Sequence, residues 1–510
     1  MTPAVSGARI VIAIDGRPLP PGAVVAVARH GVGVGLTTEA ISAMEASSRH
    51  VQALAHSDHP VYGVSTGFGA LATTHIPVDR RADLQRSLIR SHAASNGALV
   101  DREVVRGLML LRLRTLATGR TGVRPIVAET LVDLLNAGIT PAVREFGSLG
   151  CSGDLAPLAH VALTLMGEGE CADDMRAAGI EPVTLQEKEG LALINGTEGM
   201  LAMLVLALHD LRSLVTHADL AAAMSVEALL GTDRVFAGDL QQLRPQPGQA
   251  VSAANMRKVL DGSAIVASHR GPEDTRVQDA YSLRCAPQVA GACRDTIEHC
   301  ARVATNELAS TIDNPVVLAD GRIESNGNFH GAPVGYALDF LAIAAADLAS
   351  ISERRTDRML DKNRSHGLPP FLAHEPGVDS GHMIAQYTQA GLVSEMKRLA
   401  VPASVDSIPS SAMQEDHVSM GWSAARKLRR AIDGLTRVLA IEVYTAARGI
   451  DMRAPLAASP ATAAVITAIR DSVAGPGTDR HLSPEIDAVV ALASSGALVA
   501  AAESVTGPLA

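Results

Sequence analysis

Aromatic side chains are almost absent from this sequence, making up only 2% of its 510 residues. A core of this size must therefore consist of Ala, Leu, Val, Ile and Met, and Ala and Leu have the highest helix propensities. Hydrophobic residues account for 47% and charged residues for 19%, proportions that exclude wholesale disorder. The composition predicts a large, mainly helical globular protein with more than one domain.

Paired cysteines and recognisable metal motifs are also missing. The five cysteines form no C-x-x-C pair, and no H-E-x-x-H occurs. These absences argue against a disulfide framework and a zinc site, and they favour the reducing cytoplasm. The net charge of −10 argues against a nucleic-acid partner, which needs clustered Lys and Arg. We also expect no signal peptide and no membrane contact, because the longest apolar run, 200–208, is too short to span a bilayer and reads as a buried helix.

The pattern of the chain changes near residue 195. Residues 1–194 mix short extended segments with helices, and we interpret them as an N-terminal domain. Residues 195–510 contain long helices separated by polar or glycine-rich loops, and we interpret them as a second domain. The fold class is therefore predicted as mainly α, with a long-helix bundle core and a smaller mixed N-terminal part containing short strands. The expected strands are 9–14 and 31–36, and the expected helices include 38–56 with Thr38 as N-cap, 84–94, 103–117 and 336–358.

The most informative string is Gly150-Cys151-Ser152-Gly153, followed by Asp154. A hydrolase elbow, G-x-S-x-G, would need glycine where Asp154 stands. A thiol nucleophile at Cys151 would need a nearby base, which the sequence does not reveal. A simple glycine-rich turn is also compatible with the string.

A fourth interpretation of the string is backbone cyclisation. Attack of the Gly153 nitrogen on the Cys151 carbonyl carbon would close a five-membered ring. Loss of two waters, one of them from the Ser152 side chain, would leave an exocyclic methylene. Glycine permits the close approach, and the first residue contributes only its carbonyl, so Cys should serve as well as Ala.

The string resembles the signature of the aromatic amino-acid ammonia-lyases, whose 4-methylidene-imidazol-5-one group forms from Ala-Ser-Gly. The similarity extends over nearly the whole chain. The matching motifs are Tyr62-Gly-Val-Ser-Thr-Gly-Phe-Gly69, Asn195-Gly-Thr197, Gln278-Asp-Ala-Tyr-Ser-Leu-Arg-Cys285, Gly327-Asn-Phe-His-Gly331 and Gln414-Glu-Asp-His-Val-Ser-Met-Gly421.

The resemblance implies a role for individual residues of these motifs. Tyr62 or Glu415 would remove the β-proton of the substrate, and Tyr281 would also take part in catalysis. Arg284 would bind the substrate carboxylate, for which a guanidinium offers a planar fork. The prosthetic group would form from Cys151, Ser152 and Gly153 with Asn195 and Phe329 beside it, and His92, Gln278, Arg284, Asn195 and Glu415 would bind substrate.

Two positions indicate the substrate. Members of the family that act on histidine resemble this chain in Ser91-His92 and in Glu415, whereas those acting on tyrosine or phenylalanine differ at both. A carboxylate suits an imidazole but would be desolvated at a cost beside a phenyl ring. The resemblance therefore implies elimination of ammonia from L-histidine to give trans-urocanate. It also implies a homotetramer with shared active sites, and no metal or external cofactor is expected.

Alternatives remain open from the sequence. A sibling enzyme acting on tyrosine or phenylalanine, or an aminomutase, would use the same prosthetic group. From other classes, a hydrolase centred on Cys151 or Ser152 and a catalytically silent helical scaffold are the rivals. The chain also departs from the family pattern at Ser95, Glu198, His382 and Met413.

Overall fold

The computed structural model describes residues 11–55, 66–67, 74–271, 274 and 277–510. The chain divides into two compact units, each discontinuous in sequence. The domain boundary predicted between residues 194 and 195 lies inside unit 1. The division of the chain into domains at this point remains a prediction. Unit 1 comprises Met1–Leu206, Ala301–Asp339 and Pro402–Arg426, and unit 2 comprises Ala207–Cys300, Phe340–Val401 and Lys427–Ala510.

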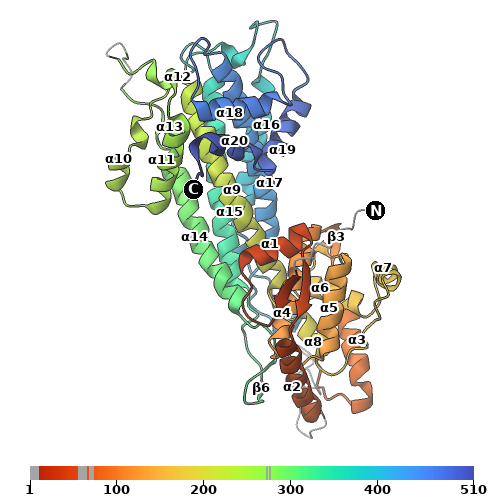
Figure 1. The fold of residues 1–510 in the computed structure, drawn as a ribbon. Coiled ribbons are helices and arrows are strands. Elements are labelled where there is room, and N and C mark those ends of the chain that lie inside the picture. Colours follow the sequence, from red (N-terminus) through yellow and green to blue (C-terminus); the bar gives the residue numbers. More distant parts are fainter. Residues whose placement is uncertain (1–10, 56–65, 68–73, 272–273, 275–276) are drawn as a thin grey trace, which may run out of the picture. The chain divides into compact units, whose positions relative to one another are not determined.

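The predicted fold class is confirmed, because helices dominate the described residues and the strands are few and short (Figure 1). Strands β1 (Val11–Ile14) and β2 (Gly33–Leu36) pair in parallel, joined through helix α1 (Pro21–His30). Two further antiparallel pairs are β3 (Asn96–Leu99) with β4 (Arg144–Phe146), and β5 (Val316–Val317) with β6 (Ile323–Glu324). All the strands among the described residues belong to unit 1, and neither antiparallel pair was predicted from the sequence.

The N-terminal helices of unit 1 build its core around α4 (Arg102–Ala117), most of whose side chains are buried. The cap of helix α2 (Thr38–Ala55) lies one residue earlier than predicted: the amide of Ala40 donates to Thr37 Oγ1 at 3.2 Å, so Thr37 is the cap and Thr38 lies inside the helix. The helices are α2 (Thr38–Ala55), α3 (Arg81–His92), α4 (Arg102–Ala117), α5 (Pro125–Ala137), α6 (Leu155–Leu165), α7 (Ala172–Ala177) and α8 (Glu189–Ile194).

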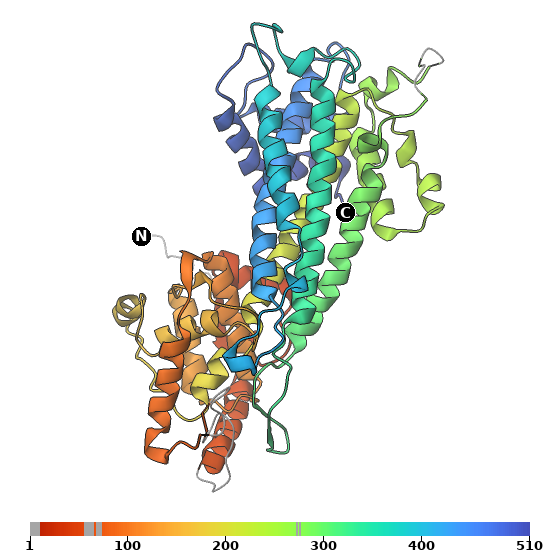
Figure 2. The same cartoon turned by 180° about the vertical axis from the view of Figure 1, so that it is seen from behind.

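Long helices run alongside one another in unit 2 (Figures 1 and 2). The carboxylate of Glu442 on α17 (Gly421–Asp451) accepts hydrogen bonds from three side chains. They are Ser225 on α9 (Glu198–Ala228) and Ser352 and Arg355 on α15 (Ala332–Leu360). Helices α9 (Glu198–Ala228), α14 (Ala286–Ala309), α15 (Ala332–Leu360) and α17 (Gly421–Asp451) are each divided between the units. The remaining helices of unit 2 are α10 (Gly238–Gln242), α11 (Pro247–Leu260), α12 (Ala264–Ala267), α13 (Tyr281–Arg284), α16 (Met383–Leu399), α18 (Pro460–Arg470), α19 (Leu482–Ser494) and α20 (Ala497–Thr506).

Two of the described helices, α9 and α15, are long and apolar enough to cross a membrane by length and composition alone. However, 78% of the apolar window of α9 and 61% of that of α15 is buried inside the protein. The run 200–208 lies within α9 and is buried throughout, as predicted from its composition. Burial against other helices therefore accounts for much of their apolar character.

Candidate active site

A pocket of about 710 Å³ lies within unit 1 and is lined by five segments of the chain. They are the described residues between 67 and 76, helix α3, the stretch from Ser152 to the start of α6, the end of α8 and the segment 411–415. Four residues predicted for the site line it: His92, Ser152, Asn195 and Glu415. The other lining residues are Gly67, Thr74, Ile76, Leu84, Ser87, Leu88, Ser91, Leu155, Leu191, Ile194, Ser411 and Ala412.

His92 is the last residue of α3, and its ring is fixed by the preceding turn. Its Nδ1 lies 2.9 Å from the carbonyl oxygen of Leu88. Because a carbonyl can only accept, Nδ1 carries the proton and Nε2 is the basic nitrogen. Burial lowers the pKa of His92 below its ordinary value, although the Leu88 carbonyl and the Glu415 carboxylate act in the opposite direction. His92 is therefore neutral at pH 7 and offers a hydrogen-bond acceptor.

Glu415 is held by a short backbone pairing with Ser410. The two residues exchange backbone hydrogen bonds of 3.0 and 3.3 Å, and the Ser410 hydroxyl donates to Glu415 Oε2 at 2.7 Å. The other carboxylate oxygen, Oε1, lies 3.5 Å from the Ser152 hydroxyl. Residues 411–413, which connect the pair, all have positive φ angles, an unusual backbone for non-glycine residues. The pairing thus directs a carboxylate at the predicted ring-forming serine.

The Cys151-Ser152-Gly153 loop is packed tightly against the segment that follows α8. Gly153 has φ +77° and forms a bridge with Gly196, and a Cβ on Gly153 would lie 2.0 Å from the Gly196 carbonyl oxygen. Only glycine fits there, which matches the close approach that ring closure needs. The same loop is bound on its N-terminal side, where the Met420 amide donates to the Leu149 carbonyl at 2.9 Å. The residues present therefore fit the predicted prosthetic group.

Asp154, the residue that argues against a hydrolase elbow, holds this loop in place through hydrogen bonds. Its carboxylate accepts from the Ser148 hydroxyl at 2.9 Å and from the Met200 amide at 2.8 Å, and its amide donates to the Gly196 carbonyl at 2.7 Å. The Met200 amide belongs to the first turn of α9, whose N–H groups have no partner within the helix. Burial raises the pKa of Asp154 to about 7. Asp154 thereby connects the loop to α9.

The Cys151 thiol lies in surroundings that oppose its ionisation. Burial raises its pKa to about 12, and the Glu415 carboxylate contributes in the same direction. A thiol nucleophile needs a lowered pKa, because the thiolate is the reactive form. The surroundings of Cys151 therefore argue against the hydrolase interpretation.

We predict that Cys151→Ala still forms the ring, because position 151 supplies only its backbone carbonyl. The intact mass of the variant should lie two waters below its sequence mass. Alkylation of the wild-type protein by iodoacetamide at neutral pH should leave Cys151 unmodified, given its raised pKa. A variant with its full sequence mass would contradict the prediction and would show that the thiol takes part in cyclisation.

Asn195 ends α8, and its side chain is held by backbone carbonyls. Its Nδ2 donates to the carbonyls of Leu191 at 3.1 Å and Asn314 at 3.5 Å. Its own carbonyl oxygen accepts from Arg112 Nη2 at 2.7 Å. Phe329 is half-buried in the same unit but is not among the described residues that line the pocket.

The predicted residues of the Gln278–Cys285 motif belong to unit 2. Gln278 is exposed, and Tyr281, the first residue of α13, is 71% exposed. The Arg284 guanidinium carbon lies 4.6 Å from the centre of the Tyr281 ring, within the range of a cation–π contact. Arg284 Nε is buried without a hydrogen-bond partner among the described atoms.

Tyr62, the predicted proton-transfer residue, lies outside the described residues. Of the departures from the family pattern, His382 is buried in unit 2 and its ring stacks on Tyr444 with centroids 4.3 Å apart. Met413 is 66% exposed and belongs to the positive-φ segment before Glu415. Ser95 donates its amide to His160 Nε2 at 3.3 Å.

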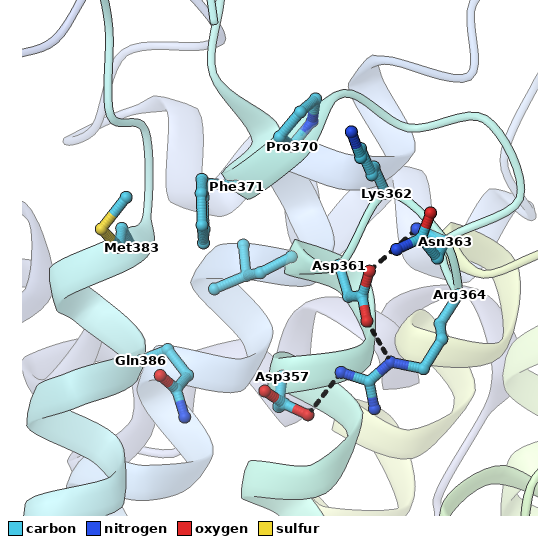
Figure 3. A pocket seen from close by; sticks show the side chains of 10 residues that line it. Asp357, Asp361, Lys362, Asn363, Arg364, Pro370, Phe371, Met383 and Gln386 are labelled. Carbon is cyan, nitrogen blue, oxygen red and sulfur yellow. Dashed lines mark hydrogen bonds and ion pairs between the residues drawn. The ribbon is translucent and has the colours of Figure 1, made fainter. Parts of the chain in front are cut away.

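Unit 2 contains a pocket of its own, of about 440 Å³ (Figure 3). Its charges are largely paired with each other: Arg364 donates to Asp361 at 2.5 Å and to Asp357 at 2.8 Å. None of the residues predicted for catalysis lines it. The described residues also contain no group of three or more His, Cys, Asp or Glu side chains arranged for a metal ion.

Three groups that hold His92, Glu415 and Asn195 at the pocket of unit 1 were missed by the sequence interpretation. They are the Leu88 carbonyl, the Ser410 hydroxyl and the Arg112 guanidinium. The first two have no sequence signal, since any residue has a carbonyl and serines are common in loops. Arg112 had one: it interrupts the otherwise apolar stretch Leu108-Met-Leu-Leu-Arg-Leu113 of a helix. A charged residue inside such a stretch is expected to have a buried partner.

Residues 19–471 match the sequence model of a family described as aromatic amino acid lyase. The chain is 66% identical over 498 residues to a histidine ammonia-lyase from Streptomyces avermitilis, with 96% of this chain and 97% of that one covered. It is 49% identical over 496 residues to a histidine ammonia-lyase from Symbiobacterium thermophilum, with 95% and 97% covered.

Solved structures with this fold include enzymes of two activities. The structure of a tyrosine aminomutase from Streptomyces globisporus has a TM-score of 0.93 at 37% identity, covering 98% of this chain and 100% of that one. A histidine ammonia-lyase from Trypanosoma cruzi has a TM-score of 0.88 at 37% identity, covering 97% and 95%. Since an aminomutase and a lyase share the fold, the choice between them depends on the pocket and on sequence identity.

Proposed function

Because the chain belongs to the aromatic amino acid lyase family, we propose that it eliminates ammonia from L-histidine to give trans-urocanate. The observation that carries the proposal is the meeting of His92 and Glu415 in the pocket that contains Ser152. The identity of 66% to a histidine ammonia-lyase supports the same substrate.

His92 and Glu415 would bind the substrate imidazole by complementary hydrogen bonds. An imidazole has one N–H donor when neutral and two when protonated. His92 Nε2 accepts, because Nδ1 is committed to the Leu88 carbonyl. The Glu415 carboxylate also accepts and adds a favourable charge when the substrate ring is protonated. A phenyl or phenol ring would leave at least one of these acceptors without a donor, which costs free energy where the bound substrate excludes water from it.

The prosthetic group would be 4-methylidene-imidazol-5-one, formed from Cys151, Ser152 and Gly153. When formed, it supplies an electrophilic carbon that converts the substrate amino group into a better leaving group. Gly153 and Gly196 would hold the loop close enough for cyclisation, and Asn195 would lie beside the product ring.

Removal of the weakly acidic β-proton requires a base, and Glu415 or Tyr62 would provide it. A base must come within hydrogen-bond reach of the proton it takes. The position of Glu415 supports this role, because its Oε1 lies 3.5 Å from the hydroxyl of the predicted ring-forming Ser152. Hydrogen bonding from Ser410 fixes the carboxylate in place.

The active site would be completed by residues of unit 2 from another copy of the chain, in a homotetramer. All described residues that line the pocket belong to unit 1. Gln278 and Tyr281 are exposed in the single chain, and the guanidinium of Arg284 keeps a buried nitrogen without a partner. Exposed apolar side chains on α15, namely Tyr336, Phe340 and Ile343, recur at helical spacing and support association through this helix.

The test is incubation of the purified protein with L-histidine, L-tyrosine and L-phenylalanine in separate reactions. We expect the ultraviolet absorption of urocanate and stoichiometric ammonia from histidine alone. Formation of coumarate or cinnamate, or of a β-amino acid without ammonia, would contradict the proposal in favour of a sibling enzyme. The intact mass of the same sample, two waters below the sequence mass, would report the ring independently of the substrate.

A further inference from the structure

Arg112 and Glu198 form an ion pair that is almost completely inaccessible to solvent. Arg112 Nη2 lies 2.5 Å from Glu198 Oε1, and the two side chains are 0% and 5% exposed. The Thr115 hydroxyl donates to the same carboxylate oxygen at 3.0 Å. Burying two charges is costly in itself, and such a pair is weak evidence for stability. What the pair holds in place therefore matters more than its own strength.

The guanidinium of Arg112 donates hydrogen bonds to backbone carbonyls at the end of α8. Nη1 donates to the Ala192 carbonyl at 3.0 Å, and Nη2 donates to the Asn195 carbonyl at 2.7 Å. The last carbonyl groups of a helix have no hydrogen-bond donor within the helix, and the Asn195 carbonyl is such a group. Arg112 therefore fixes the backbone from which the Asn195 side chain enters the pocket.

Gly196 lies between this ion pair and the predicted ring-forming loop. A Cβ on Gly196 would clash with Arg112 Nη2 and Glu198 Oε2, so the charged groups occupy the space beside Gly196 that a side chain would need. The same residue forms the bridge with Gly153 and accepts the Asp154 amide at 2.7 Å. The position of Gly153 is thus coupled, through one glycine, to the position of the ion pair.

We propose that Arg112 and Glu198 are positioning residues of the active site, holding Asn195 and Gly196 in register with the Cys151-Ser152-Gly153 loop. This inference rests on the proposed function insofar as Asn195 and the loop are its catalytic machinery. It also assigns a role to Glu198, one of the departures from the family pattern. A lysine at 112 could still pair with Glu198, but it could not direct a second donor group to the Ala192 carbonyl while bound to Asn195.

The experiment compares Arg112→Lys with Arg106→Lys, a matched control on the same helix. Arg106 is also buried and donates to the carbonyls of Val27 and Leu135 at 3.1 Å each, with no contact to Asn195. We expect similar drops in melting temperature for both variants. In Arg112→Lys, kcat per ring-bearing chain should fall by about tenfold to a hundredfold, the effect of an ångström-scale displacement, whereas in Arg106→Lys it should stay within about twofold.

A double-mutant cycle with Asn195→Ala tests the coupling itself. If Arg112 acts through Asn195, then Arg112→Lys should lower kcat by less than about twofold in the Asn195→Ala background. If its effect on kcat is the same in both backgrounds, the inference is overturned. Equal kcat losses in Arg112→Lys and Arg106→Lys would overturn it too, because the guanidinium would then serve the fold alone.

Glu198→Gln keeps the inference testable if Arg112→Lys does not fold, since it preserves size and a hydrogen-bond acceptor. We expect kcat about three- to tenfold below wild type with ring formation retained, because the guanidinium loses its charged partner. An unchanged kcat in Glu198→Gln would overturn the inference.

A folded Arg112→Lys protein that keeps its full sequence mass would support the inference, since Gly196 would then no longer hold Gly153 for cyclisation. Wild-type protein that makes no urocanate would instead refute the proposed function, and the kcat ratios would then be measured by product formation from the amino acid it does accept.

Discussion

Replacing Ser152 with Ala is expected to abolish ring formation and to lower kcat by about 10⁴- to 10⁶-fold, the range seen when an essential catalytic group is removed. The exocyclic methylene derives from the Ser152 side chain, and alanine has no hydroxyl to eliminate. The intact mass should equal the full sequence mass, in contrast to wild type. Folding should be preserved, since among the described residues the Ser152 side chain makes one long hydrogen bond, 3.5 Å to Glu415.

Cys151→Ala is the matched control for this prediction, because it changes the neighbouring side chain and leaves Ser152 intact. The control should lose two waters and retain activity. Full activity in Ser152→Ala would contradict the proposed chemistry, whatever its mass. Circular dichroism and melting temperature of both variants establish that any loss of activity does not come from unfolding.

Replacing Glu415 with Gln is expected to lower kcat for histidine by about 10²- to 10⁴-fold, the usual contribution of a general base. The amide keeps the shape of the carboxylate and an acceptor for the Ser410 hydroxyl, which now lies 2.7 Å from Oε2. It cannot accept a proton or attract a cationic imidazole. The ring should still form, so the intact mass should match that of wild type.

Asp416→Asn provides the control, since this exposed carboxylate is the neighbour of Glu415 and does not line the pocket. We expect its kcat to stay within about twofold of wild type, as for most surface substitutions. A loss below about threefold in Glu415→Gln would eliminate Glu415 as the base and transfer that role to Tyr62. Measurement of KM in the same series separates proton removal from imidazole binding. A loss of substrate binding raises KM with kcat unchanged, whereas a loss of proton removal lowers kcat.

Much of the fold follows from local sequence pattern. The spacing of Leu338, Leu341, Ala345 and Leu348 predicts one face of a helix, and α15 spans that region. The apolar run 200–208 predicts a buried helix and lies inside α9. The error at Thr38 arose because neighbouring threonines are equivalent candidates until the hydroxyl that accepts the Ala40 amide is known.

Other features had no local signal. The strands β5 and β6 are two residues each, too short for an alternating pattern to be recognised. The Ser410–Glu415 pairing depends on three consecutive positive φ angles, which the residues Ser411, Ala412 and Met413 do not favour intrinsically. Such a backbone persists only where the surrounding structure imposes it.

The sequence by itself determined the family, the mainly helical fold class and the proposed chemistry, because these depend on residue types at fixed spacing along the chain. The tertiary structure decided how His92, Ser152 and Glu415 meet in one pocket, which nitrogen of His92 is basic and which residue the charge of Glu198 pairs with. The physical reason is that tautomers, pKa shifts and buried ion pairs depend on the distance between groups remote in sequence. Folding alone establishes those distances.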